Sequence, residues 1–393
     1  MTRTSPLAER LEGFGASIFA EMTALAVSTG SINLGQGFPD YDGPADVLRI
    51  AQEQIAGGAN QYPPGIGSPD LRLAVSEHQR RFWGLEYDPD TEILVTMGAT
   101  EALAGALLGM LNTGDEVIVF EPLFDTYAAC IALAGAVLVP VTLRPNAAGR
   151  YEFDPEQLRA AVSSRTRMIL LNSPHNPAGT VFTRAELQLV ADIAVDRDLI
   201  VVSDEVYEHL TFDGAVHFPI ATLPGMKERT VTISSGGKSF NTTGWKIGWA
   251  CAPAPLLNAV RMAKQLFTFA GGTGFQPAIA AGLRLPDSYF VELAADLQTK
   301  RDVLAAGLTH AGIIPYESRG TYFLTADIRG VSTDGDGMAF CRSMPSRYGV
   351  VAIPAGVLYS PSNQREGRHI VRFAFCKQLP TITAAAERLA AGK

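Results

Sequence analysis

Short apolar runs rich in β-branched residues recur along the chain, and longer amphipathic or alanine-rich stretches separate them. A run of about five such residues is typical of a buried strand, whereas the longer stretches are typical of helices that pack on a sheet. We therefore predict strands near residues 93, 117, 168, 199, 230 and 247. Strands that alternate with helices favour an α/β fold, with a mostly parallel mixed sheet between helices.

The C-terminal part of the chain has a different pattern, which indicates a smaller α+β domain. It predicts a strand over Thr321–Asp327, a helix over about 336–347, strands over Val350–Ile353 and His369–Phe375, and a terminal helix. Apolar residues at helical spacing also follow the N-terminus, so we expect an arm and a helix that complete this domain. The predicted boundaries are 1–44 for the arm, 45–290 for the large domain and 291–393 for the C-terminal small domain.

A lysine stands between two of the predicted strands, just after paired glycines. The segment Ser235-Gly-Gly-Lys238 leads to a second lysine at Lys246. Most single lysines are solvated surface charges, but here the glycines let the backbone approach a ligand, and Ser235 and Lys246 offer a hydroxyl and a cation to a phosphate. A desolvated lysine near another cation has a lowered pKa and forms a Schiff base with an aldehyde. A lysine beside a phosphate site suggests pyridoxal 5′-phosphate.

Ser235-Gly-Gly-Lys238 together with Thr243-Gly-Trp-Lys246 resembles the cofactor-lysine motif of class I (fold type I) pyridoxal-phosphate aminotransferases. The wider family usually has arginine where this chain has Lys246, and the kynurenine aminotransferase-like branch has lysine. The segments around residues 60–65, 98–102 and 243–251 look most like actinobacterial N-succinyldiaminopimelate aminotransferases. The resemblance runs from Leu34 to Lys377, and it implies that Lys238 is catalytic and binds the cofactor covalently in the large domain.

The resemblance also implies the other cofactor contacts. Ala99 and Thr100, in a small-residue turn at a helix start, would form a second wall of the phosphate site with Ser235 and Lys246. The remaining roles fall on four side chains: Phe124 would stack on the pyridine ring, Asp204 would pair with its nitrogen, and Tyr207 and Asn176 would bind its 3′ oxygen. Asn176 lies in an N-x-P-x-N-P-x-G loop, whose prolines restrict its direction.

Four residues are implied as substrate contacts, and two more as contacts across a dimer. Arg372 would hold the α-carboxylate with a bidentate fork, helped by Asn176 and by the backbone of Gly37, while Phe19 would line the side-chain pocket. Tyr62 would reach the cofactor phosphate of the other subunit, and Thr273 is a further candidate for that phosphate. We therefore expect a homodimer with shared active sites.

The implied activity is transfer of an amino group between an L-amino acid and a 2-oxo acid by a ping-pong mechanism. Substrates left open are N-succinyl-LL-2,6-diaminopimelate with 2-oxoglutarate, kynurenine, glutamine, methionine and aromatic amino acids. A cysteine-S-conjugate β-lyase would use the same lysine. A silent cofactor-binding regulator would carry a DNA-binding domain, and none is visible. A nicotinamide dehydrogenase is disfavoured because no G-x-G-x-x-G follows a predicted strand.

Composition excludes further classes. Among the 393 residues the net charge is −8 and no basic run occurs, so a nucleic-acid partner is not expected. The longest apolar run, Ala102–Leu111, is shorter than the roughly 20 residues that cross a bilayer, and no secretory signal is apparent, so we expect a cytoplasmic protein without a membrane partner. The four scattered cysteines predict buried free thiols and no structural metal.

Overall fold

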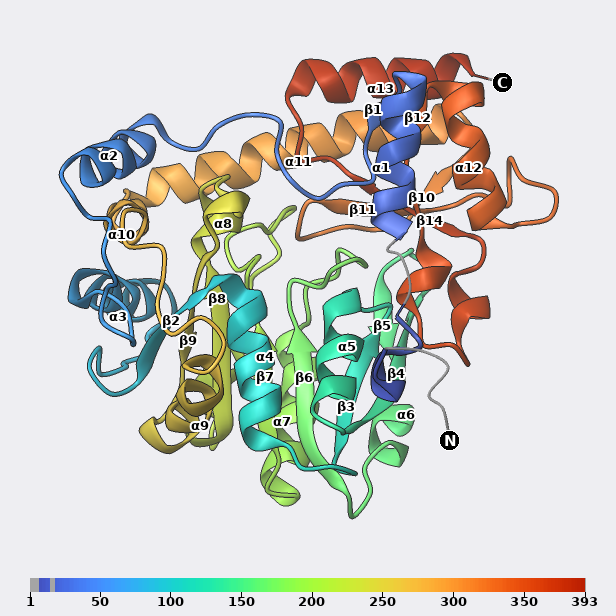
Figure 1. Ribbon diagram of the computed structural model, residues 1–393. Coiled ribbons are helices and arrows are strands. Elements are labelled where there is room, and N and C mark those ends of the chain that lie inside the picture. Colours follow the sequence, from blue (N-terminus) through green and yellow to red (C-terminus); the bar gives the residue numbers. More distant parts are fainter. Residues whose placement is uncertain (1–6, 15–17, 393) are drawn as a thin grey trace.

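The main sheet of the computed structural model, which describes residues 7–14 and 18–392, has eight strands in its described part, in the order β2-β9-β8-β7-β6-β3-β4-β5 (Figure 1). The strands are β2 (Ile93–Met97), β3 (Glu116–Glu121), β4 (Val137–Pro145), β5 (Tyr151–Phe153), β6 (Thr166–Asn172), β7 (Ile200–Asp204), β8 (Thr230–Ser235) and β9 (Ile247–Cys251). Strands from β8 to β4 are mutually parallel, while β2, β9 and β5 are antiparallel to their neighbours. The predicted mostly parallel mixed sheet is confirmed.

Two strands of this sheet, β4 and β5, lie outside the predicted set. The strand β4 contains Pro140 and ends at Pro145, and its first half is only partly buried. Proline and partial exposure both weaken the sequence signal of a strand, because proline donates no ladder hydrogen bond. Tertiary pairing with β3 therefore determines β4 more than its own pattern does.

Helices cover both faces of the sheet, as the alternation along its strands requires. On β3, Ile118 and Phe120 pack with α7 (Arg184–Asp196) on one face. The intervening Val117 and Val119 pack on the other face. There the layer consists of α4 (Gly98–Met110), α5 (Asp125–Leu133) and α9 (Ala254–Lys264), as Figure 1 shows. Both faces are apolar, so the strand ends are the places where polar side chains gather.

The other helices are α1 (Ile18–Thr29), α2 (Ala45–Ala56), α3 (Pro69–Trp83), α6 (Pro155–Ala160), α8 (Gly236–Ser239), α10 (Gln276–Leu283), α11 (Asp287–His310), α12 (Gly337–Tyr348) and α13 (Leu379–Ala391). Among them, α6, α8 and α10 lie outside the predicted set, and the rest follow the predicted pattern with small shifts at their ends. The sequence from about Leu256 to Phe269 predicts one continuous helix, but α9 ends at Lys264. The chain turns there, and Phe269 has a φ of 57°, which no helix residue adopts.

A second, smaller sheet has four described strands in the order β10-β11-β14-β13, all antiparallel. These are β10 (Ile314–Pro315), β11 (Phe323–Asp327), β13 (Ile353–Pro354) and β14 (Ile370–Ala374). The predicted strand over Val350–Ile353 divides into β12 (Val350–Val351) and β13, which belong to different sheets. The strand β12 pairs with β1 (Ile32–Asn33) of the N-terminal arm, so the arm completes the C-terminal part as expected.

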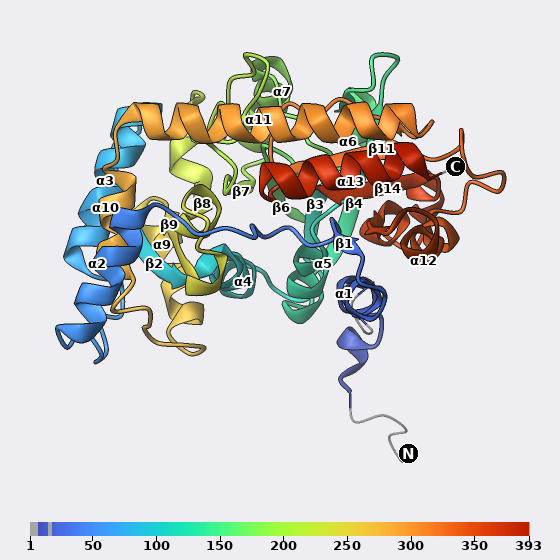
Figure 2. The ribbon, with the colours of Figure 1, turned by 90° about the horizontal axis from the view of Figure 1, so that it is seen from above.

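The predicted domain boundaries remain predictions. Helix α11 passes residue 290 without a break and then lies beside α13, as both views show (Figures 1 and 2). Residues 1–6 and 15–17 of the predicted arm lie outside the described residues. The four cysteines are free and buried, as expected, and no helix in the described part of the chain is long and apolar enough to cross a membrane.

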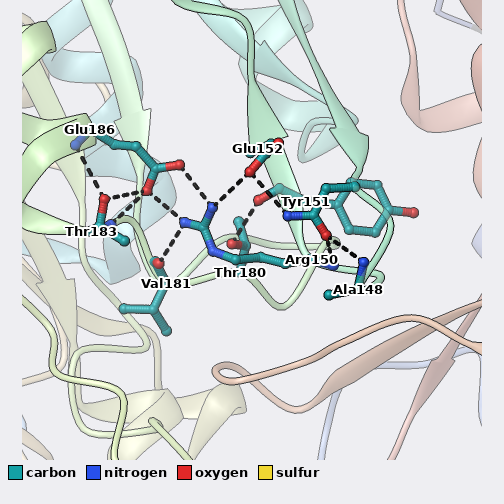
Figure 3. A network of polar contacts seen from close by, with 9 residues as sticks. Ala148, Arg150, Tyr151, Glu152, Thr180, Val181, Thr183 and Glu186 are labelled. Atoms are coloured by element: carbon teal, nitrogen blue, oxygen red, sulfur yellow. Dashed lines mark hydrogen bonds and ion pairs between the residues drawn. The ribbon is translucent and has the colours of Figure 1, made fainter.

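A polar network anchors the start of α7 to the sheet edge (Figure 3). The guanidinium of Arg150 donates two hydrogen bonds to the carboxylate of Glu186, at 3.0 and 2.5 Å, and a third of 3.4 Å to the carbonyl of Val181. Glu186 also closes a capping box with Thr183, the N-cap of α7, as the Thr183-x-x-Glu186 spacing predicts. The Glu186 carboxylate thus accepts hydrogen bonds both from the N-cap residue of α7 and from Arg150.

We expect Thr183→Ala to destabilise the protein by about 1 kcal/mol, because the N–H of Glu186 loses its side-chain acceptor. Urea denaturation measures the change. Thr309→Ala is the control, since the Thr309 hydroxyl only bonds the carbonyl of Ala305 within α11. An equal midpoint for Thr183→Ala and the wild type would contradict a stabilising cap.

Candidate active site

A cavity of about 360 Å³ opens where β6, β7 and β8 end, beside the first turn of α4. Carboxyl ends of adjacent parallel strands meet at one edge of a sheet, which is where α/β proteins bind ligands. The sequence-predicted residues that line it are Phe19, Gly37, Ala99, Thr100, Phe124, Asn176, Asp204, Tyr207, Ser235, Lys238, Lys246 and Arg372. These positions span nearly the whole chain, and the fold brings them to one place.

Lys238 lies in the single helical turn α8, between β8 and β9. Its amine donates a 2.8 Å hydrogen bond to the hydroxyl of Tyr322 and lies 5.8 Å from the ring centre of Tyr207. Burial lowers the pKa of this amine from 10.5 to about 8, and the positive charges of Lys246 and Arg372 act in the same direction. A substantial neutral fraction at pH 7 to 8 makes the amine a nucleophile and a base.

The first turn of α4 and Lys246 form one anion-binding cradle. A Cβ placed on Gly98, the first residue of α4, would lie 3.2 Å from the Lys246 amine, so that amine sits against the helix start. A Cβ on Gly248 would lie 2.4 Å from the carbonyl carbon of Gly98, so only glycine permits this approach of β9 to α4. Free N–H groups, a helix dipole and a cation together suit a phosphate.

The backbone at Lys246 is unusual, which fits a functional position. Its φ is 53°, in the left-handed region that non-glycine residues rarely adopt. Ser235, at the last position of β8, is the N-cap of α8 and is buried. Strain of this kind persists where the surrounding structure holds a side chain in a required direction.

Asp204, the last residue of β7, is a buried carboxyl with few partners. It accepts a 2.6 Å hydrogen bond from the Tyr127 hydroxyl and a 3.3 Å bond from the N–H of Val206. Burial raises the pKa of Asp204, and these two hydrogen bonds oppose the rise. A buried carboxylate is costly unless it is paired, so this site favours a cationic group from a ligand.

Arg372, in β14, is buried between the rings of Phe323 and Phe19, whose centres lie 4.1 and 5.1 Å from its guanidinium carbon. It donates 3.0 Å and 3.4 Å hydrogen bonds to the Gly35 carbonyl and to the side-chain oxygen of Asn176. Its Nε has no partner among the described residues, and burial lowers the pKa of Arg372 to about 10. A buried guanidinium without a carboxylate partner favours binding of a carboxylate ligand.

Three further predicted residues complete the wall. Gly37 approaches so closely that a Cβ there would lie 2.5 Å from the ring of Phe323. Phe124, the N-cap of α5, faces the ring of Tyr127 edge-on at 5.6 Å. Tyr207 is buried, and burial raises the pKa of its hydroxyl. The hydroxyl therefore stays protonated and can donate a hydrogen bond.

Tyr62 and Thr273 do not line the cavity of their own chain. The Tyr62 side chain is 80% exposed and meets the exposed ring of Phe269 edge-on at 5.8 Å. The Thr273 hydroxyl donates to the carbonyl of Gln61, so the two loops lie together. Both contacts with a partner subunit stay predictions.

Sequence reasoning missed two hydroxyl groups of the site, those of Tyr127 and Tyr322. Tyr127 follows Phe124 by three positions at a helix start, and this spacing is a usable signal. Tyr322 carries no such signal, because its contacts with Lys238 and Gly37 join three distant segments. The sequence places His175 in the same loop as Asn176, where we expect a loop residue and not a base. It is buried beside the Phe120 carbonyl, and burial lowers the pKa of this imidazole to about 4.

His78, Glu208 and His209 are close enough together to hold a metal ion, outside the cavity. Protein partners already engage them: the two imidazoles hydrogen-bond each other at 2.7 Å, and Glu208 accepts from Trp83 and Ser234 at 2.6 Å each. The prediction of no structural metal is not tested by this arrangement.

Comparison with known proteins identifies the fold and the family. The M. tuberculosis protein named "Probable N-succinyldiaminopimelate aminotransferase" is 50% identical over 97% of both chains. The Escherichia coli methionine aminotransferase is 38% identical over 97% of both, and a Dictyostelium discoideum kynurenine–oxoglutarate transaminase is 38% identical over 99% of this chain and 97% of its own. The relatives named here are all transaminases, so the β-lyase alternative gains no support.

Solved structures agree with these relatives. N-succinyldiaminopimelate aminotransferase from Mycobacterium tuberculosis superposes with a TM-score of 0.95 at 49% identity, covering 98% of this chain and 100% of its own. The E. coli methionine aminotransferase gives 0.92 at 38%, covering 99% and 100%. The model of the family "Aminotransferase class I and II" matches residues 29–389. The chain belongs to the class I and II aminotransferases, a family of pyridoxal-phosphate-dependent transaminases.

Proposed function

We propose that this aminotransferase performs both half-reactions in the cavity around Lys238, with the residue roles predicted from the sequence. The observation that carries the proposal is the low-pKa amine of Lys238 beside a buried arginine without a carboxylate partner among the described residues, a buried carboxyl and an anion cradle. These groups fit the cofactor: the cradle suits its phosphate, Lys238 its aldehyde and Asp204 its protonated ring nitrogen. Tyr207, Asn176 and Phe124 line the same cavity, where Tyr207 and Asn176 would bind its 3′ oxygen and the ring of Phe124 would cover its face.

When bound, pyridoxal phosphate supplies an electron sink for the charge that develops at the substrate Cα. Arg372 binds the substrate α-carboxylate and Gly37 limits its position, so the amino group is presented to the cofactor. Lys238 would act as the base for the Cα proton and as the acid that returns it at C4′ of the cofactor. Asp204 holds the positive charge at the ring nitrogen throughout. One site serves the amino acid and then the 2-oxo acid, which requires ping-pong kinetics.

We propose N-succinyl-LL-2,6-diaminopimelate and 2-oxoglutarate as the substrate pair. The 50% identity to the Mycobacterium tuberculosis relative supports this assignment. Kynurenine, glutamine, methionine and aromatic amino acids are the second candidates, favoured by the apolar lining of Val206 and Phe323, which belong to one hydrophobic cluster with Phe19. The names of the E. coli and Dictyostelium relatives point to methionine and kynurenine.

We also propose that the protein is a homodimer in which loops of each subunit complete the active site of the other. We propose further that it is cytoplasmic. The large side chains of Tyr62, Leu266, Phe267 and Phe269 are 52–80% exposed in the single chain, and such exposure favours an interface. Tyr62 would then reach the phosphate in the partner's cavity. Buried free thiols support a reducing compartment. The proposed domains are a large cofactor-binding domain over residues 45–290 and a small domain formed by residues 1–44 and 291–393.

Amino-acid specificity tests the function directly. The loaded enzyme is mixed with single amino acids, without a 2-oxo acid, and the absorbance change of the cofactor is followed. We expect the N-succinyldiaminopimelate rate constant to exceed those for kynurenine, glutamine, methionine and phenylalanine. Lys238→Ala should lose at least about 10³-fold in rate, because the proton-transfer group is removed, whereas Lys227→Ala should not. No absorbance change with any of these amino acids in the wild type would reject the proposal.

Replacing Arg372 by lysine tests carboxylate binding. Lysine keeps the charge but loses the two-pronged geometry, so kcat/KM should fall about 10²-fold for the amino acid and the 2-oxo acid alike. Arg368→Lys is the matched control, since that side chain pairs with Asp336 at the surface. Steady-state kinetics with both substrates varied gives the two values. Similar kinetics in both variants would remove Arg372 from the carboxylate site.

Hybrid dimers test the role of Tyr62. In a hybrid of one Tyr62→Phe chain and one Lys238→Ala chain, one of the two sites would combine an intact Lys238 with an intact partner Tyr62. We expect this hybrid to bind pyridoxal phosphate at that site about tenfold more tightly than the Tyr62→Phe homodimer, because one hydrogen bond to a charged phosphate is restored. Activity at limiting cofactor is the measurement. A hybrid no better than the Tyr62→Phe homodimer would place Tyr62 outside the partner's site.

A further inference from the structure

Tyr322 joins the catalytic lysine to the N-terminal arm. It immediately precedes β11 in the small sheet and is buried. Its hydroxyl lies 2.8 Å from the Lys238 amine and 2.7 Å from the Gly37 carbonyl oxygen. The hydroxyl therefore contacts both Lys238, in the turn between β8 and β9 of the main sheet, and Gly37 of the N-terminal arm.

The direction of both hydrogen bonds follows from the chemistry of the groups. A carbonyl only accepts, so the single Tyr322 proton goes to Gly37. The phenol oxygen is left as an acceptor, and the Lys238 amine must donate to it. A neutral amine that donates one N–H in this way has its lone pair directed elsewhere. The lone pair is therefore free for a proton on a substrate in the cavity.

The arm that carries Gly37 is itself held in place by the small domain. Arg372 donates to the Gly35 carbonyl at 3.0 Å, and Lys377 donates to the Phe38 carbonyl at 2.6 Å. A Cβ on Gly37 would lie 3.2 Å from the Tyr322 ring, so the arm rests directly on that ring. The acceptor of the Tyr322 proton is thus fixed by the same arginine that is proposed to bind the substrate carboxylate.

We propose that Tyr322 is a positioning residue for Lys238: its hydroxyl, oriented by Gly37, holds the free amine so that its lone pair faces the substrate Cα. This inference rests on the proposed role of Lys238 as the base. The orientation of the Lys238 amine would therefore depend on the position of the N-terminal arm. Loss of the hydroxyl should disturb the amine while the cofactor and carboxylate contacts stay intact.

Tyr322→Phe removes only the oxygen and retains the ring. Tyr289→Phe is the matched control, because it also loses one phenol-to-carbonyl bond, from Tyr289 to Ser239, the neighbour of Lys238, without touching the amine. The full-length protein is loaded with pyridoxamine 5′-phosphate, so that the Lys238 amine is free. Trace acetylation between pH 6 and 10, quantified by mass spectrometry of the Lys238 peptide, reports the neutral fraction.

The midpoint of the acetylation curve should move to lower pH by about one unit in Tyr322→Phe, because a phenol oxygen that accepts from the ammonium form stabilises that form. The other titratable groups around the amine are Asp204, Lys246, Arg372 and Cys376, which keep their side chains, and Tyr207, whose hydroxyl also loses its side-chain contact with Tyr322. The half-reaction rate constant of Tyr322→Phe should fall about tenfold, although more of its amine is neutral, with little change in KM. Tyr289→Phe should match the wild type in both measurements.

A midpoint and a rate equal to those of the wild type in Tyr322→Phe would overturn the proposal and leave Tyr322 as a packing residue. Equal rate losses in Tyr322→Phe and Tyr289→Phe, without a midpoint shift, would overturn it as well. Thermal unfolding checks that both variants are folded. The acetylation measurement does not depend on turnover, so failure of the transaminase assignment in the wild type is distinguishable from failure of this role.

Discussion

Desolvation of charged groups in one cavity is the constraint on which the site depends. Lys238, Arg372 and Asp204 are all taken out of water, and none of them forms a salt bridge among the described residues, although Lys238 and Asp204 attract each other through space. Burying an uncompensated charge is unfavourable, and a ligand with charges opposite to those of the buried groups offsets this desolvation free energy. The same burial brings the pKa of Lys238 to about 8, where an amine is both nucleophilic and basic.

The fold supplies the rigidity that keeps such groups in position. Apolar side chains pack on both faces of the main sheet, so the sheet itself offers no place for polar ligands. The ends of β6, β7 and β8 are the exception, and a single close approach between Gly248 and Gly98 brings the first turn of α4 there as well. Preorganised N–H groups and cations then need little rearrangement when an anion binds.

Sequence reasoning recovered the parts of the molecule that local pattern determines. The residues at or just after the ends of β6, β7 and β8 belong to recognisable motifs, so the sequence predicts that Asn176, Asp204 and Lys238 share one site, and the fold brings all three to one cavity. The strand β4 was not predicted, because its prolines weaken the sequence pattern of a strand and pairing with neighbouring strands determines its structure. Tyr322 was not found either, since its two hydrogen bonds depend on how the arm and the small sheet meet.

The pattern of contacts along the arm has a consequence for how the enzyme family can diversify. The carbonyls of Gly35, Gly37 and Phe38 are all held by side chains of the C-terminal part, and β1 pairs with β12 of the same part. The Arg372 side of the cavity is therefore tied to the arm and to the small sheet, while Asn176, Asp204 and Lys238 lie at or just after the ends of strands of the main sheet. Because Tyr322 joins the arm to Lys238 and Arg372 joins it to Asn176, a substitution that shifts the arm would change substrate selectivity and the surroundings of the lysine together.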